Sequence, residues 1–237
     1  MAEILGTVEI EPGETPSGAV VWLHGLGASG HDFEDVVPLL QLPQVRFVFP
    51  HAPKRPVTIN SGLIMPAWYD IRFLGGESGG EEPRHVRDSA QLIQALLERE
   101  QQRGIPASRI VLAGFSQGGA MALHVGTRYR KRLLGLLVLS GYEVLADTRQ
   151  AEVSPENLET PLLCCHGLFD DLVDIERARL AYEAFAQPGR PAAWHEFPQG
   201  HEVSYEEIEV VRLWLAERFS EPGPETPSTG AAPATPV

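Results

Sequence analysis

Short apolar runs alternate with longer amphipathic segments along most of this 237-residue chain, and this alternation limits the fold more than any other feature. Each run is bounded by glycine or proline and lacks strict alternation of apolar and polar residues. This pattern is typical of strands buried on both faces of a parallel sheet. The runs are Ala19–Leu23, Val45–Phe49, Ile110–Ala113, Leu134–Leu139, Leu162–Cys165 and Ala193–Phe197.

Helix-length segments lie between these runs. In the last of them Ile208, Val211, Leu215 and Phe219 recur at three- and four-residue steps, as expected for a helix with one apolar face. The alternation predicts an α/β fold in which a mostly parallel sheet carries helices on both faces. The segment Leu5–Ile10 is a candidate for an additional antiparallel edge strand. The helical segments are His31–Leu40, Arg84–Arg103, Ser116–Arg130, Glu176–Gln187 and Ser204–Phe219, with a capping-box pattern at Ser204 and Glu207.

The C-terminal segment differs from the rest in composition. From Ser220 to Val237 it contains five prolines and no aromatic residue. Such a segment buries too little apolar surface to offset the entropy lost on ordering. We therefore predict one folded domain over residues 1–219 and a disordered Pro/Thr/Ala-rich tail over residues 220–237. No long helical insertion follows Leu139, so we expect the domain to lack a cap.

Charge and apolar content exclude several classes of partner. The chain has 19 basic and 32 acidic residues, a formal net charge of −13, which repels nucleic-acid phosphates and anionic membrane surfaces. No apolar run approaches the roughly 20 residues of a membrane-spanning helix. We therefore expect no nucleic-acid partner and no stable membrane insertion, whereas the oligomeric state, monomer or homodimer, stays open.

The two cysteines and the N-terminal segment indicate a cellular compartment. Cys164 and Cys165 are adjacent, and neighbouring strand residues point to opposite faces, so we expect no disulfide between them. They are typical of small core residues in a reducing compartment. The first residues lack the basic and apolar regions of a signal peptide, so we expect a cytoplasmic protein.

A nucleophile motif directly follows the third apolar run. The sequence Gly114-Phe115-Ser116-Gln117-Gly118 matches G-x-S-x-G between a predicted strand and a predicted helix, which is the arrangement of a nucleophile elbow. The glycines leave room for neighbouring backbone, and the helix N-terminus favours negative charge on a developing oxyanion. The alternative is a glycine-rich nucleotide-binding turn, but G-x-G-x-x-G and a P-loop lysine are both absent.

A serine nucleophile needs a base and an acid, which in this fold follow it in the order acid, histidine. His201 comes just after the last predicted strand and is the expected base, although a solvated loop histidine is the alternative. Asp170 is the expected acid, with Asp171 as its rival. Asp174 more plausibly caps the helix that follows.

Two backbone N–H groups should form an oxyanion hole. One belongs to Gln117, the residue after the nucleophile, and the best candidate for the other is Leu26 in the segment 24–27. The alternative for segment 24–27 is an ordinary glycine-rich loop.

Together these residues resemble the phospholipase/carboxylesterase family of α/β-hydrolases, which includes bacterial carboxylesterases, lysophospholipase-like enzymes and acyl-protein thioesterases. The resemblance covers the whole predicted domain and excludes the tail. It implies a single-domain α/β-hydrolase with the triad Ser116–Asp170–His201, and it implies that neither a metal nor an organic cofactor is needed. The matching blocks are residues 22–27, 67–71, 114–120, 166–170 and 200–201.

The segment from Pro50 to Glu77 is long and has no clear helix, and long loops in compact domains are commonly functional. In the family that the chain resembles, this region flanks the acyl-binding groove. We therefore expect Leu63, Met65 and Trp68 to contact the substrate. The alternative is that Trp68 and Tyr69 anchor the loop to the core.

These observations predict a serine carboxylesterase that hydrolyses small acyl esters of short to medium chain length through an acyl-enzyme intermediate. Acyl-protein thioesterase or lysophospholipase activity by the same mechanism is the alternative. A catalytically silent binding module is more remote, because neither a broken triad nor a lost elbow glycine is present. A lactone hydrolase of the cysteine-nucleophile type is disfavoured by serine at position 116.

Overall fold

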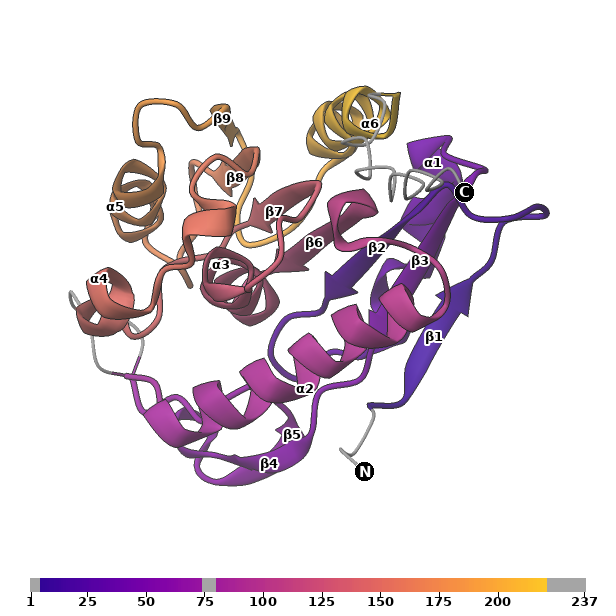
Figure 1. The fold of residues 1–237 in the computed structure, drawn as a ribbon. Coiled ribbons are helices and arrows are strands. Elements are labelled where there is room, and N and C mark those ends of the chain that lie inside the picture. The colour runs from indigo at the N-terminus through magenta and orange to yellow at the C-terminus, as the bar shows by residue number, and fades with distance from the viewer. Residues whose placement is uncertain (1–4, 74–79, 221–237) are drawn as a thin grey trace, which may run out of the picture.

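The computed structural model describes residues 5–73 and 80–220. Their main feature is a seven-stranded sheet in the order β1-β3-β2-β6-β7-β8-β9 (Figure 1). Strand β1 pairs with β3 in antiparallel orientation, and every other neighbouring pair in this sheet is parallel. All six predicted strands and the candidate edge strand are therefore present. Their bounds are β1 Thr7–Ile10, β2 Gly18–Leu23, β3 Val45–Pro50, β6 Ile110–Phe115, β7 Gly135–Leu139, β8 Leu162–Gly167 and β9 Ala192–Phe197.

Helices cover both faces of this sheet (Figure 1). Helices α2, α3 and α5 contribute to one apolar cluster, and α1 and α6 contribute to the cluster on the other face. Their bounds are α1 Val37–Leu40, α2 Pro83–Gln102, α3 Gln117–Arg128, α4 Arg149–Glu152, α5 Ile175–Phe185 and α6 Tyr205–Ser220, with 3-10 turns at η1 Gly30–Val36, η2 Thr58–Asn60, η3 Ala107–Arg109, η4 Ala146–Thr148 and η5 Pro155–Asn157.

Successive strand residues separate into the two clusters, as the pleat of a strand requires. In β6, Leu112 packs on the side of α2 and α3, whereas Val111 packs on the side of α6. Cys164 and Cys165 divide in the same way, and both are buried free thiols. The expected separation of the two cysteines is thus confirmed.

The folded domain extends one residue beyond its predicted C-terminal boundary at residue 219. Helix α6 includes Ser220, whose Oγ donates to the carbonyl of Glu217 at 2.7 Å, so residue 220 belongs to the folded part. The remainder of the predicted tail, residues 221–237, lies outside the described residues. Residues 140–161 are all described and contain only α4 and two 3-10 turns, in agreement with a domain that lacks a cap. Within the described ranges, no helix combines the length and apolarity needed to cross a membrane.

The segment predicted as a long loop contains a hairpin instead. Strands β4 (Lys54–Val57) and β5 (Leu63–Pro66) form a separate antiparallel sheet joined through η2. The sequence did not indicate this hairpin, because prolines inside apolar runs argue against strands. Proline is tolerated here since a two-stranded sheet consists of edges only. Part of the predicted loop, residues 74–79, lies outside the described residues.

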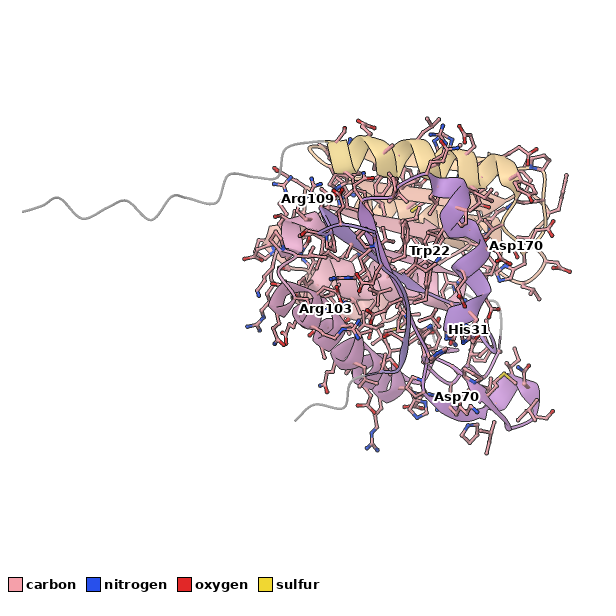
Figure 2. The ribbon with its side chains drawn as sticks, turned by 90° about the vertical axis from the view of Figure 1, so that its right-hand side faces the viewer. Trp22, His31, Asp70, Arg103, Arg109 and Asp170 are labelled. Carbon is pink, nitrogen blue, oxygen red and sulfur yellow. The ribbon has the colours of Figure 1, made fainter. Side chains whose placement is uncertain are left out.

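The strand order places the loops after β2 and β6 beside each other. The chain leaves β2 toward β3 on one side and later enters β6 on the other, so a crevice forms where the carboxyl ends of β2 and β6 diverge. In Figure 2, Asp170 after β8 and His31 after β2 lie at the edge opposite Arg109, which precedes β6. The candidate site residues therefore share the carboxyl edge of the sheet.

Candidate active site

Ser116 occupies the sharp turn between β6 and α3. Its backbone has φ 55° and ψ −121°, a left-handed conformation that costs energy in a residue with a side chain. The two flanking glycines make this turn possible. A Cβ on Gly114 would lie 2.2 Å from the carbonyl oxygen of Gly118, and a Cβ on Gly118 would lie 2.3 Å from that of Leu23. The geometry is that of the predicted nucleophile elbow.

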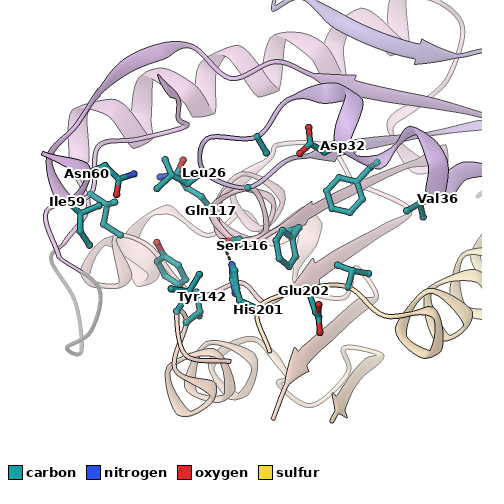
Figure 3. A pocket seen from close by; sticks show the side chains of 18 residues that line it. Leu26, Asp32, Val36, Ile59, Asn60, Ser116, Gln117, Tyr142, His201 and Glu202 are labelled. Carbon is teal, nitrogen blue, oxygen red and sulfur yellow. Dashed lines mark hydrogen bonds between the residues drawn. The ribbon is translucent and has the colours of Figure 1, made fainter. Parts of the chain in front are cut away.

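The three residues of the predicted triad lie within hydrogen-bond distance of one another (Figure 3 shows the serine–histidine pair). His201 Nε2 is 2.8 Å from Ser116 Oγ, and His201 Nδ1 is 2.7 Å from Asp170 Oδ2. The Asp170 side chain is fully buried and that of His201 is 12% exposed. With Nδ1–H directed at the carboxylate, Nε2 is the nitrogen free to accept the hydrogen of the serine hydroxyl.

Asp170 is held by its own turn. Oδ1 accepts hydrogen bonds from the backbone N–H groups of Leu172, at 3.0 Å, and Val173, at 2.8 Å, which leaves Oδ2 for His201. Burial raises the pKa of Asp170, but the hydrogen bonds from Val173 and His201 outweigh burial and hold the pKa below its ordinary value. The carboxylate is therefore ionised at neutral pH.

The other aspartates of this turn, and two other histidines that follow Ser116 in the sequence, have different surroundings. Asp174 caps α5 by accepting from the N–H of Glu176 at 2.8 Å, as predicted, and His201 Nδ1 is hydrogen-bonded to Asp170, not to the rival Asp171. His124 is buried in α3, where burial lowers its pKa to about 3. His195 is exposed on the edge strand β9.

Both proposed oxyanion donors border the same cavity as Ser116. Gln117 is the first residue of α3, where a backbone N–H has no acceptor within the helix. Leu26 belongs to the loop after β2, and this loop is tied to the hairpin because the N–H of Gly27 donates to the carbonyl of Pro66 at 2.9 Å. Figure 3 shows Leu26 and Gln117 on one side of Ser116.

Trp68 contacts both the loop after β2 and the elbow through hydrogen bonds. Its indole donates to the carbonyl of His24 at 2.9 Å, and its backbone N–H donates to Gln117 Oε1 at 2.7 Å. Gln117 Nε2 in turn donates to the carbonyl of Tyr69 at 2.9 Å. The Gln117 side chain thus joins the elbow to residues 68–69, which follow the hairpin, a role that the sequence pattern did not indicate. The motif G-x-S-x-G accepts any residue at the position after the serine, which Gln117 occupies, so the motif gave no signal for this role.

His24 is a further residue that sequence reasoning did not assign. It is buried, its Nε2 accepts from the N–H of Ala52 at 3.0 Å, and its Nδ1 donates to the carbonyl of Gly25 at 2.7 Å. The ring therefore holds the start of the loop that carries Leu26. The sequence feature that could have indicated this role is a polar residue directly after a buried strand.

An open cavity of about 570 Å³ adjoins Ser116 and His201 (Figure 3). Leu63, Met65 and Trp68, the predicted substrate contacts, are not among its lining residues. Trp68 is 0% exposed and serves as an anchor, and Leu63 is 63% exposed on the hairpin. Met65 packs, as Leu26 and Ile59 do, against the small buried cluster of Val57, Ala67 and Ile71. The apolar and aromatic side chains that do line the cavity are Leu26, Phe33, Val36, Ile59, Ile71, Phe115, Tyr142, Leu172, Val173 and Val203.

The comparisons with known proteins agree with this geometry. The sequence profile of the family described as Phospholipase/Carboxylesterase matches residues 6–218. Acyl-protein thioesterase 1 of Gibberella zeae is 35% identical over 214 residues, which cover 86% of this chain and 91% of that protein. Acyl-protein thioesterase 1 of Yarrowia lipolytica is 32% identical over 213 residues, covering 86% of this chain and 93% of that protein.

Solved structures have the same architecture. Arabidopsis thaliana SOBER1 superposes with a TM-score of 0.78 at 29% identity, covering 85% of this chain and 98% of that one. Zea mays acyl-protein thioesterase 2 has a TM-score of 0.78 at 28% identity, covering 90% of this chain and 99% of that one. A family match across nearly the whole described domain, together with this fold, shows that the chain belongs to the phospholipase/carboxylesterase family of α/β-hydrolases.

Proposed function

We propose that this protein is a serine carboxylesterase that hydrolyses short- to medium-chain carboxylic esters. The observation that carries the proposal is the continuous hydrogen-bonded series Asp170–His201–Ser116 at the wall of an open cavity. A serine hydroxyl with a histidine at 2.8 Å and a buried carboxylate behind it is the arrangement that activates an alcohol for attack on an acyl group.

In the first half of the reaction, Ser116 Oγ attacks the ester carbonyl while His201 Nε2 takes its hydrogen. The carbonyl π electrons move to oxygen, and the resulting oxyanion accepts hydrogen bonds from the N–H groups of Leu26 and Gln117. Asp170 stabilises the imidazolium that forms. Collapse of the tetrahedral intermediate breaks the bond to the alcohol, which takes the hydrogen from His201, and leaves Ser116 acylated.

In the second half, His201 Nε2 takes a hydrogen from water as its oxygen attacks the acyl-enzyme. The second tetrahedral intermediate uses the same two N–H donors. It collapses with return of the hydrogen to Ser116 Oγ, which releases the carboxylic acid and restores the starting enzyme.

The cavity lining supports a small, uncharged acyl substrate. Apolar and aromatic side chains predominate, and a volume of about 570 Å³ lies within the usual range for small-molecule sites. The cavity is lined by two acidic side chains, Asp32 and Glu202, so a strongly anionic substrate would be repelled.

Acyl-protein thioesterase activity is the second candidate. It is favoured by the relatives from Gibberella zeae and Yarrowia lipolytica, which carry that name and match 86% of this chain. The same serine chemistry serves both substrates, because a thiolate can leave from the tetrahedral intermediate as an alkoxide does. Lysophospholipid hydrolysis would use the same steps, and the family's description includes phospholipases.

One experiment tests both the mechanism and the ranking of substrates. A fluorophosphonate probe should label the wild-type protein at Ser116, and the Ser116→Ala variant should lose both the label and hydrolysis of 4-nitrophenyl esters. Labelling that survives in Ser116→Ala would overturn the assignment. A thioester or lysophospholipid hydrolysed with a kcat/KM more than about tenfold above the best ester, roughly 1.4 kcal/mol of transition-state preference, would reverse the ranking.

A further inference from the structure

A buried histidine that the proposed reaction does not use lies directly behind the candidate acid. His166 is the penultimate residue of β8 and is 0% exposed. Its ring stacks on that of Trp194 with centroids 6.0 Å apart and planes 13° from parallel. The ring is therefore held inside the protein, four residues before Asp170.

The two ring nitrogens of His166 have different surroundings. Nε2 lies 2.9 Å from the carbonyl oxygen of Val173, and because a carbonyl oxygen can only accept, Nε2 must carry the hydrogen. Nδ1 is buried and has no hydrogen-bond partner in the part of the chain that the structure describes. Burial lowers the pKa of His166, since a second ring hydrogen would be buried without an acceptor. The neutral Nε2–H form is thus favoured.

This Nε2–H faces the turn that holds Asp170. Val173 donates its N–H to Asp170 Oδ1 at 2.8 Å, and its carbonyl accepts from His166. The same Nε2 lies 3.4 Å from Asp170 Oδ2, which is the oxygen bonded to His201 Nδ1. His166 therefore contacts both the peptide that fixes one carboxylate oxygen and the second oxygen itself.

We propose that His166 is a positioning residue whose neutral Nε2–H anchors the turn 170–173 and directs Asp170 Oδ2 toward His201. The inference rests on the proposed function, because it gives His166 a part in the same reaction. Small displacements of a reacting group, about 1 Å, can cost roughly 100-fold in rate. A ring that only filled space beneath Trp194 would affect stability and leave the chemistry of the folded enzyme unchanged.

Two substitutions separate positioning from packing. His166→Phe keeps a ring on Trp194 but removes the donor, whereas His166→Gln keeps an N–H at a similar reach from the backbone. With a 4-nitrophenyl ester, we expect His166→Phe to lower kcat by roughly 100-fold with little change in KM. The acid limb of its pH profile should move to lower pH, because a displaced carboxylate stabilises the His201 imidazolium less. His166→Gln should recover kcat to within about tenfold of wild type.

The chain offers a matched control in His124. This histidine is also buried, 4% exposed, but among the described residues no hydrogen bond or ion pair joins it to Ser116, Asp170 or His201. His124→Phe should lower thermal stability without moving the pH limb or kcat of the folded fraction, which is measured by titration with the fluorophosphonate probe.

The outcomes distinguish this inference from the proposed function. If wild type is labelled at Ser116 and hydrolyses the ester, but His166→Phe keeps the wild-type kcat and pH limb per labelled site, His166 is only a packing residue. If wild type is not labelled at Ser116, the proposed function itself fails. Should His166→Phe not fold, NMR of the wild-type imidazole decides: a persistent Nε2–H from pH 5 to 9 supports the proposal, and titration in that range overturns it.

Discussion

Two regions border the cavity, and they are built by different means. The catalytic edge, defined here as residues 114–118, 166–173 and 199–202, lies where parallel strands end, and its side chains are fixed by backbone contacts. The hairpin β4–β5, residues 54–66, is a separate two-stranded sheet with Leu63 and Ile64 exposed at 63% and 66%. The first region therefore tolerates almost no change in backbone, whereas the second presents Leu63 and Ile64 to solvent.

The difference shows where the precision of the site originates. At the catalytic edge, the buried central strands β6 and β8 determine the direction of the loops that carry Ser116 and Asp170. The hairpin is connected to the site by the hydrogen bond from Gly27 N–H to Pro66, and the two residues 68–69 just after it are connected by the Gln117 side chain. The hairpin thus supports the oxyanion loop from outside without needing a tightly packed surface of its own.

The largest expected difference in stability between the two regions comes from replacing one glycine in each of them by alanine, which adds one methyl group. Gly118→Ala should destabilise folding by more than about 5 kcal/mol, because its Cβ would lie 2.3 Å from a backbone oxygen that cannot move aside. Gly62→Ala in the hairpin turn should cost about 1 kcal/mol, since φ is +77° but no atom lies within 4 Å of its added Cβ. Urea unfolding of both variants measures the contrast, and equal losses would remove the proposed difference between the regions.

The next effect concerns the joint between the regions. Gln117→Ala removes the partners of the Trp68 N–H and the Tyr69 carbonyl, both buried, and should lower the free energy of unfolding by about 4 kcal/mol. Asn60→Ala is the control within the hairpin region, because Asn60 is exposed and, among the described residues, its amide donates only to the Met65 sulfur. A Gln117→Ala variant as stable as Asn60→Ala would show that the hairpin is held by other contacts.

These two regions also differ in how far the sequence predicted them. The central strands β2, β3, β6, β7 and β8 could be predicted because burial on both faces leaves short apolar runs, and the elbow because its glycines are sterically required. The positions of Asp170 and His201 followed from the rule that active groups gather where parallel strands end. The sequence therefore located the candidate triad without a structure.

The hairpin and the cavity wall could not be predicted in the same way. Pro56 and Pro66 hide two edge strands from any strand pattern, and the apolar residues 63–65 resemble a binding surface although Leu63 and Ile64 face solvent. Trp68 was predicted as a substrate contact but is an anchor, because its indole hydrogen bond to His24 depends on a contact 44 residues distant in sequence. Such long-range pairings leave no local signal.

The pH dependence of stability should also differ between the two regions, with an effect of intermediate size. Behind His201, burial raises the pKa of Glu207 to about 7, although Gln199 donates to its carboxylate at 2.6 Å. A raised pKa in the folded state gives stability that is present below pH 4.5 and lost as the pH rises through about 7. Stability of wild type relative to Glu207→Gln should therefore fall by about 3 kcal/mol between pH 4 and 8, measured by urea unfolding at each pH.

Asp70, which is hydrogen-bonded to the hairpin turn, should behave in the opposite sense. Burial raises its pKa, but hydrogen bonds from Thr58 Oγ1 and N–H, at 2.7 and 2.6 Å, together outweigh burial and hold the pKa below its ordinary value. Its contribution is present above the unfolded pKa, near 3.8, and is lost as the pH falls. Asp70→Asn should therefore reduce stability most at neutral pH and progressively less as the pH falls below about 3.8. A parallel pH dependence for Asp70→Asn and Glu207→Gln would contradict this assignment.

The smallest effect is expected on the outer face of the hairpin. Leu63→Asn and Ile64→Asn should change the free energy of unfolding by less than about 0.5 kcal/mol, because both side chains are mostly exposed and neither lines the cavity. Hydrolysis of a water-soluble 4-nitrophenyl ester should keep its wild-type kcat/KM. Ile71→Asn is the matched contrast, since Ile71 lines the cavity and is 3% exposed, so both stability and kcat/KM should fall. A loss of ester hydrolysis in Leu63→Asn without a loss of stability would instead place the outer hairpin in direct contact with the substrate and restore the binding role that the sequence predicted for it.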